Sequence, residues 1–143
     1  MKEKRTGELV GSVFGNLLAL AIVNTVIIWR QYTHGVVLES WVNVLWAANL
    51  SLIVQLGGNL VLAFYRPAGL YAFMEMAFAG LGLVSLIVFF IVFPLDFSVV
   101  AGPWLNTLAR VLIVLGMAGS CIGTLVWLVR LVSGREYSAV SAG

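Results

Sequence analysis

Four long apolar stretches fill most of this 143-residue chain, at about residues 9–29, 42–65, 68–93 and 103–132. Because an α-helix rises about 1.5 Å per residue, about 20 apolar residues cross a hydrocarbon layer of about 30 Å, and each stretch reaches that length. The chain is 62% apolar and 10% charged, whereas a soluble surface usually carries about 25–35% charged residues. The sequence therefore predicts an integral membrane protein with one transmembrane domain, residues 1–143.

The connections between these stretches predict a simple all-α topology. They hold only two to twelve residues, and helices joined by short loops pack as antiparallel neighbours. Pro67 lies in the shortest connection and suits the first turn of the next helix. We expect an antiparallel four-transmembrane-helix bundle that runs up-down-up-down. The two halves do not mirror each other, so an inverted-repeat transporter is not indicated.

Basic residues predict the orientation, because short loops rich in Lys and Arg stay on the cytoplasmic side. One side of the membrane would carry Lys2, Lys4, Arg5, Arg66, Arg130 and Arg135. The other side would carry Arg30, with Arg110 set within the outer half of the fourth span. Both termini are therefore expected to be cytoplasmic, in the cytoplasmic membrane of a bacterium or archaeon.

Trp and Tyr residues fit the same frame, because these side chains concentrate at the two boundaries between lipid and water. The outer boundary would hold Trp29, Tyr32, Trp41 and Trp104, and the inner boundary Tyr65, Tyr71, Trp127 and Tyr137.

A set of polar residues recurs in the inner halves of all four stretches. It comprises Asn16, Gln55, Asn59, Glu75, Ser120 and Thr124. Four of these, one from each stretch, lie about six to nine residues from the inner end, at a depth of roughly 10–13 Å. Such groups can be interhelical hydrogen bonds of about 0.6–2 kcal/mol each. Glu75 is the strongest ligand or ion-binding candidate, because a carboxylate within a membrane must be protonated, paired or in contact with water.

A second polar set lies in the outer half and comprises Asn24, Asn49, Asn106 and Arg110. Arg110 is about seven residues inside its span and could reach the interface by snorkelling. It could form an ion pair with Asp96 or Glu39, or it could bind an anionic group.

Small residues mark where helices can approach closely. On the first stretch these are Gly11, Gly15 and Ala19, and on the fourth Gly119 and Gly123 form a small-xxx-small pair. We therefore expect these positions at helix contacts.

The residues needed for common catalytic and cofactor chemistry are missing. The single cysteine, Cys121, cannot form an intramolecular disulfide, and the single histidine, His34, cannot form a metal or haem cluster with a second one. No nucleophile-base set or phosphate loop is present. We expect a protein that is not an enzyme and has no metal, cofactor or nucleic-acid partner, although Glu75 or Asp96 leaves open an activity on a lipid.

Two functions remain. The favoured one is a non-catalytic subunit or scaffold of a larger membrane complex, of which a transport complex is one kind. Its partners would be the lipid bilayer and either further copies or other membrane subunits. The alternative is a small homo-oligomeric channel or transporter, in which Glu75 acts within a polar cavity open to the cytoplasm.

Residues 24–32, with the sequence Asn-Thr-Val-Ile-Ile-Trp-Arg-Gln-Tyr, are followed by Glu39-Ser-Trp41. This segment resembles the end of span one and the start of span two in the small four-helix subunit of tripartite periplasmic transporters. The resemblance covers about twenty residues and implies an accessory subunit of a solute transporter. The paired acids that this family carries after its tryptophan are replaced by Val42-Asn43, so the segment does not assign the chain to the family.

Overall fold

The computed structural model describes residues 6–133 and contains four long helices. These are α1 (Thr6–Thr25), α2 (Val42–Phe64), α3 (Ala68–Val92) and α5 (Pro103–Ser133), joined by the short helices η1 (Arg30–Tyr32), η2 (Glu39–Trp41) and α4 (Ser98–Ala101). All four long helices are long and apolar enough to cross a membrane, and residues 6–133 contain no β-strand. The predictions of an all-helical integral membrane protein are thus confirmed.

The helix limits follow from local sequence. Pro67 precedes α3 with an extended backbone, and Pro103 is the first residue of α5, where its missing N–H costs no hydrogen bond. The helix α1 ends at Thr25, four residues before the expected end of the first span, because residues 26–29 form a turn. The helix α3 ends at Val92, its C-cap Phe93 has the left-handed conformation (φ 39°), and Pro94 then prevents further helix.

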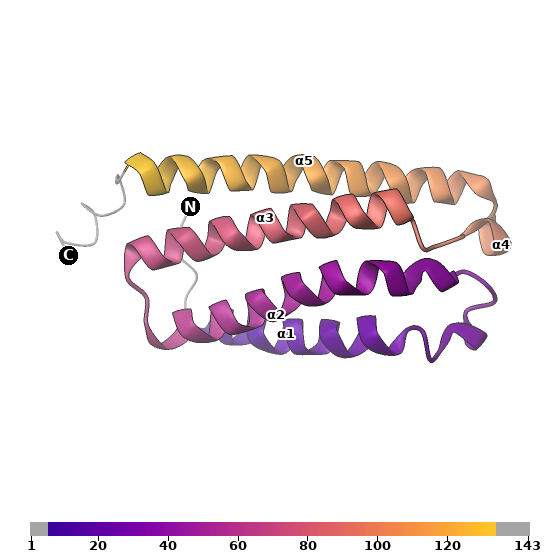
Figure 1. The fold of residues 1–143 in the computed structure, drawn as a ribbon, viewed down its shortest axis with the longest axis horizontal. Coiled ribbons are helices and arrows are strands. Elements are labelled where there is room, and N and C mark those ends of the chain that lie inside the picture. Colours follow the sequence, from indigo (N-terminus) through magenta and orange to yellow (C-terminus); the bar gives the residue numbers. More distant parts are fainter. Residues whose placement is uncertain (1–5, 134–143) are drawn as a thin grey trace.

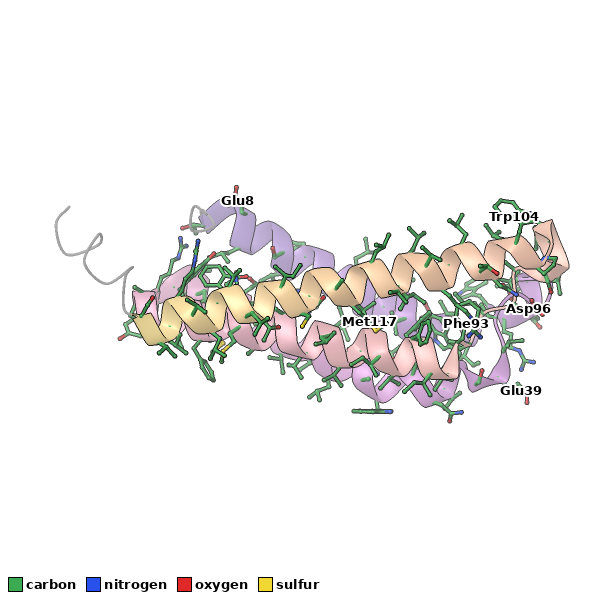
Figure 2. The ribbon with its side chains drawn as sticks, turned by 90° about the horizontal axis from the view of Figure 1, so that it is seen from above. Glu8, Glu39, Phe93, Asp96, Trp104 and Met117 are labelled. Atoms are coloured by element: carbon green, nitrogen blue, oxygen red, sulfur yellow. The ribbon has the colours of Figure 1, made fainter. Side chains whose placement is uncertain are left out.

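The long helices lie side by side, and successive ones run in opposite directions (Figure 1). The helix α1 packs on α2, α2 on α3, and α3 on α5. We call one end of this array the loop end, which holds residues 26–41 and 93–102. The opposite end is the turn end, where residues 65–67 lie near the start of α1 and the last turns of α5. Figure 2 places Glu8 at the turn end and Glu39, Phe93, Asp96 and Trp104 at the loop end.

Large apolar side chains cover the outside of the array. Phe14, Phe64, Ile91 and Val132 are 68%, 88%, 75% and 79% exposed, and many Leu, Ile and Val side chains on the long helices resemble them. In water a protein with such a surface would aggregate, whereas lipid tails solvate it. The exposed surface therefore agrees with the composition of the chain.

Candidate functional site

The inner polar set lies toward the turn end, and its α2 members form a ladder along one helix. Gln55 donates from Nε2 to Ser51 Oγ (3.0 Å), and Asn59 donates from Nδ2 to the Gln55 carbonyl oxygen (2.7 Å). Asn59 is only 2% exposed, and its Oδ1 accepts no hydrogen bond from any described residue. Asn59 thus presents a buried acceptor, which is costly unless some donor reaches it.

The remaining members of this set lie on the other three long helices. Thr124 donates to the carbonyl oxygen of Ser120 (2.8 Å), one turn earlier in α5. Glu75 is partly buried in α3, with its Oε1 fully covered, and Asn16 is partly buried in α1. The Thr124 hydroxyl thus bonds within α5 and does not join the α2 ladder.

Aromatic and aliphatic side chains close the turn end. Leu9, Leu62, Tyr71 and Trp127 come from the four long helices and form one buried cluster. The rings of Tyr71 and Trp127 meet edge to face, with centroids 5.6 Å apart. Tyr71 and Trp127 are 1% and 6% exposed, so at the turn end they pack inside the protein and do not face lipid. Boundary and core positions both favour aromatic residues, so sequence alone could not separate the two.

The other aromatic positions divide in the same way. Trp29, Tyr32, Tyr65 and Trp104 are 59%, 64%, 66% and 62% exposed at the helix ends, as a boundary residue should be. Trp41 is 9% exposed, and its Nε1 donates to the Val23 carbonyl oxygen in α1 (3.0 Å). Tyr137 lies outside the described residues.

The outer polar set separates into three parts, of which the first joins two helices. Asn24 in α1 and Asn49 in α2 exchange side-chain hydrogen bonds of 2.7 and 2.9 Å. Amides paired in this way satisfy each other across a helix contact. This pair therefore fixes the register of α1 against α2.

The second part ties the start of α5 to the loop before it. Asn106 donates from Nδ2 to Asp96 Oδ1 (2.9 Å) and accepts from the Phe97 N–H (2.7 Å). Ser98 donates to the same Asp96 oxygen through its hydroxyl and its backbone N–H. The Ser98 hydroxyl, then Asn106 and the Ser98 N–H, hold the pKa of Asp96 below its ordinary value of 3.8. The Asp96 carboxylate thus connects the loop before α5 to the first turn of α5.

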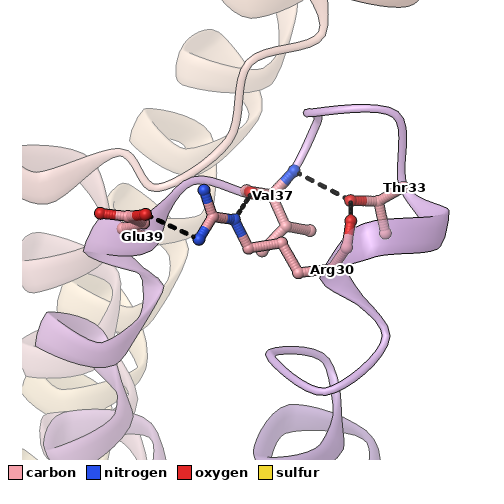
Figure 3. A network of polar contacts seen from close by, with 4 residues as sticks. All are labelled: Arg30, Thr33, Val37 and Glu39. Atoms are coloured by element: carbon pink, nitrogen blue, oxygen red, sulfur yellow. Dashed lines mark hydrogen bonds and ion pairs between the residues drawn. The ribbon is translucent and has the colours of Figure 1, made fainter.

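The two loops of the loop end are also bonded to each other. The Leu38 N–H donates to the Pro94 carbonyl oxygen (2.9 Å), and the Asp96 N–H donates to the Val36 carbonyl oxygen (2.7 Å). Arg30 adds an ion pair to Glu39 (3.0 Å) and a bond from Nε to the Val37 carbonyl oxygen (3.2 Å), as Figure 3 shows. Arg30 and Glu39 both belong to the segments that resemble the transporter subunit, and they help to build this loop structure.

Arg110 is the third part, and its expected ion pairs are absent. Glu39 is bonded to Arg30, and Asp96 is bonded to Ser98 and Asn106. The Arg110 guanidinium instead lies 4.4 Å from the ring centre of Phe93 and 5.8 Å from that of Phe90. The prediction of pairing with Asp96 or Glu39 is therefore wrong, because both carboxylates bond to other residues of the loop end.

Comparison of the chain with protein-family models, curated proteins and solved structures yields no match. The short resemblance to the transporter subunit is therefore not accompanied by a match to a family model. Among residues 6–133, no three His, Cys, Asp or Glu side chains lie together as metal ligands would.

Proposed function

We propose that this protein is a non-catalytic subunit or scaffold of a larger membrane complex. The observation that carries the proposal is the glycine face of α1, formed by Gly7, Gly11 and Gly15. A Cβ atom added at any of these positions would meet no atom within 4 Å. The spacing of Gly11 and Gly15 predicts a helix contact, yet within the described chain no helix occupies their face. Glycines four residues apart on an apolar helix are typical of a docking face for another transmembrane helix.

The topology in the proposal is an antiparallel four-helix bundle with both termini in the cytoplasm. The turn end would lie at the cytoplasmic side and the loop end at the outer side, as the distribution of basic residues favours. The membrane would be the cytoplasmic membrane of a bacterium or archaeon. In this orientation the glycine face of α1 is open to lipid, where a second copy or another subunit can approach it.

Replacement of Gly11 by leucine tests the proposal. The variant should still fold, because there is space for the new side chain, but it should prevent close helix approach. We expect the protein extracted from native membranes in mild detergent to run as an assembly larger than a monomer, and the Gly11→Leu variant to run as a monomer. Gly57→Leu is the matched control, since Gly57 on α2 also has no atom within 4 Å of an added Cβ. A monomeric parent protein would refute the proposal.

The buried Asn59 acceptor favours a second candidate, a small homo-oligomeric channel or transporter. Asn59 and Glu75 lie five and seven residues from the turn-end limits of α2 and α3, at roughly 8–10 Å of helix rise. Water or a cation between these helices would supply a partner for the Asn59 oxygen. Copies of the chain would then surround a polar path open to the cytoplasm.

Glu75→Gln keeps the shape of the side chain and removes its charge. For a channel or transporter, proton or cation flux into vesicles containing the purified protein should be lost in this variant. Glu8→Gln, at an exposed acid in the first turn of α1, should keep the flux. Equal flux in the parent protein and in Glu75→Gln would exclude this candidate.

A further inference from the structure

Arg110 lies beside an apolar groove on the outside of the α3–α5 pair. The groove has a volume of about 290 Å³ and is lined by Phe90, Thr107, Arg110, Val111, Val114 and Leu115. The five α5 residues follow 3-1-3-1 spacing and so form one stripe. From Arg110, the stripe continues through apolar side chains toward the middle of the helix. The groove therefore has a cationic end near the loop end and an apolar end deeper in the membrane.

The guanidinium has no anionic partner in the part of the chain that the structure describes. It makes neither a hydrogen bond nor an ion pair with residues 6–133, and aromatic contacts alone hold it. Phe93, the nearer ring, is 7% exposed and has the left-handed backbone conformation that non-glycine residues rarely adopt. The Arg110 guanidinium thus lies against the Phe93 ring at the mouth of the groove. Its N–H groups donate to no residue of the described chain.

The depth of Arg110 makes a lipid the natural source of the missing anion. The helix α5 has 31 residues and a length of about 46 Å, which exceeds the hydrocarbon layer by about 8 Å at each end. Arg110 is seven residues after Pro103, and so lies a few ångströms inside the hydrocarbon boundary if α5 is centred. An anion stabilises a guanidinium at this depth, and phosphate oxygens match its planar donors.

We propose that the Arg110 groove binds an anionic phospholipid, with the phosphate on the guanidinium and an acyl chain along Val111, Val114 and Leu115. This inference depends on the membrane topology given above. An anionic phospholipid neutralises Arg110, whereas a zwitterionic one brings a cation of its own. Arg130, at the turn end, lies over the Trp127 ring at 4.8 Å and does not line this groove.

The test uses the full chain in phosphatidylcholine vesicles that contain a spin-labelled lipid, with the immobilised fraction of the label measured by electron paramagnetic resonance. The parent protein should immobilise more phosphatidylglycerol than phosphatidylcholine. Arg110→Gln should lower this preference about fivefold, the effect of one basic residue near a lipid headgroup. Leu115→Trp should reduce it by filling the groove while the charge remains.

The matched control is Leu112→Trp, which enlarges an α5 side chain that is 59% exposed and does not line the groove. It should keep the preference for phosphatidylglycerol. Inorganic phosphate added in excess should not displace the labelled lipid. Displacement by phosphate would overturn the proposal in favour of an anion site, and equal preference in Arg110→Gln and the parent would overturn it outright.

Failure of this inference is distinguishable from failure of the proposed function. Accessibility of single introduced cysteines in the same vesicles reports whether the four helices cross the bilayer. If they cross it and the parent shows no lipid preference, the Arg110 site is refuted and the subunit proposal stands. If the parent protein is monomeric but Arg110→Gln loses lipid preference, the subunit proposal is refuted and the Arg110 site stands.

Discussion

The turn end and the loop end are held together by different forces. At the turn end, Leu9, Leu62, Tyr71 and Trp127 bring all four long helices into one buried apolar cluster. At the loop end, the buried cluster of Val37, Trp41 and Val44 packs with residues of α1, α2, α3 and the loops. In the described chain, no α5 residue belongs to that second cluster.

The start of α5 is instead attached by polar contacts around Asp96 and by the short helix α4. Lipid tails provide little hydrophobic drive between helices, so close packing and hydrogen bonds must specify their arrangement. This chain joins all four long helices by packing at the turn end, whereas at the loop end packing leaves out α5 and hydrogen bonds attach its start. The weaker apolar attachment of α5 at the loop end coincides with the groove beside Arg110.

The strongest test of the packed end is Trp127→Ala. The substitution would leave a hole among four helices and remove the edge-to-face contact with Tyr71, so we expect unfolding in detergent to become easier by about 2–3 kcal/mol. Thermal or denaturant unfolding followed by circular dichroism measures the change. Trp46→Ala, at a position that is 56% exposed, should cost under about 1 kcal/mol. Similar losses in both variants would show that the turn end has no special role.

A smaller loss is expected from Gly58→Ala, which tests close packing between α2 and α3. An added Cβ would lie 2.5 Å from Phe78 Cζ and 3.3 Å from Met74 Sδ, so a ring or a helix must move. We expect a loss of about 1–3 kcal/mol. Gly57→Ala has open space and should be neutral or slightly stabilising, because alanine favours helix. If Gly58→Ala were as stable as Gly57→Ala, packing at this contact would not be limiting.

The hydrogen-bonded pair Asn24–Asn49 provides an intermediate test toward the loop end. Each single substitution to alanine should destabilise the protein by about 1 kcal/mol, because one amide is left without its partner. The double substitution should cost less than the sum of the two, with a coupling of about 0.6–1.7 kcal/mol in a double-mutant cycle. Additive effects would mean that the pair does not link α1 to α2.

Acid should have the smallest effect, confined to the loop end. The pKa of Asp96 is lowered in the folded protein by the Ser98 and Asn106 hydrogen bonds. Its contribution is therefore present above the ordinary value of 3.8 and is lost as the pH falls through the lower folded value. We expect hydrogen exchange of the Asp96 and Leu38 amides to accelerate in that range while turn-end amides stay protected. In Asp96→Asn the acid dependence should disappear.

Much of the molecule was predictable from local sequence. The lengths of the four apolar stretches and the prolines at 67 and 103 predicted the long helices and two of their starts. The end of α1 at Thr25 was not predictable, because residues 26–29 are as apolar as the helix before them. Their turn conformation depends on where Arg30 meets Val37 and Glu39, and these contacts join residues seven and nine positions apart.

The candidate sites were predicted less well than the helices. Depth along a helix follows from counting residues, and so the inner and outer polar sets were found. Which partners they choose depends on helix rotation, which placed Asn24 against Asn49 but left Thr124 bonded within its own helix. Rotation also turned the face of Gly11 and Gly15 away from every other described helix.

By itself the sequence determined that the protein has four long helices that are apolar enough for a membrane. Both properties follow from the length and the hydrophobicity of each stretch, which are read without knowledge of the other stretches. Only the tertiary structure decided which faces meet, since apolar side chains look alike whether they touch lipid or protein. In the folded chain Tyr71 and Trp127 are buried, and Asp96 and Glu39 bond within the loop end. Arg110 lies at a groove, and no carboxylate of residues 6–133 pairs with it. Contacts between distant segments cause each of these outcomes, and no single stretch of sequence encodes them.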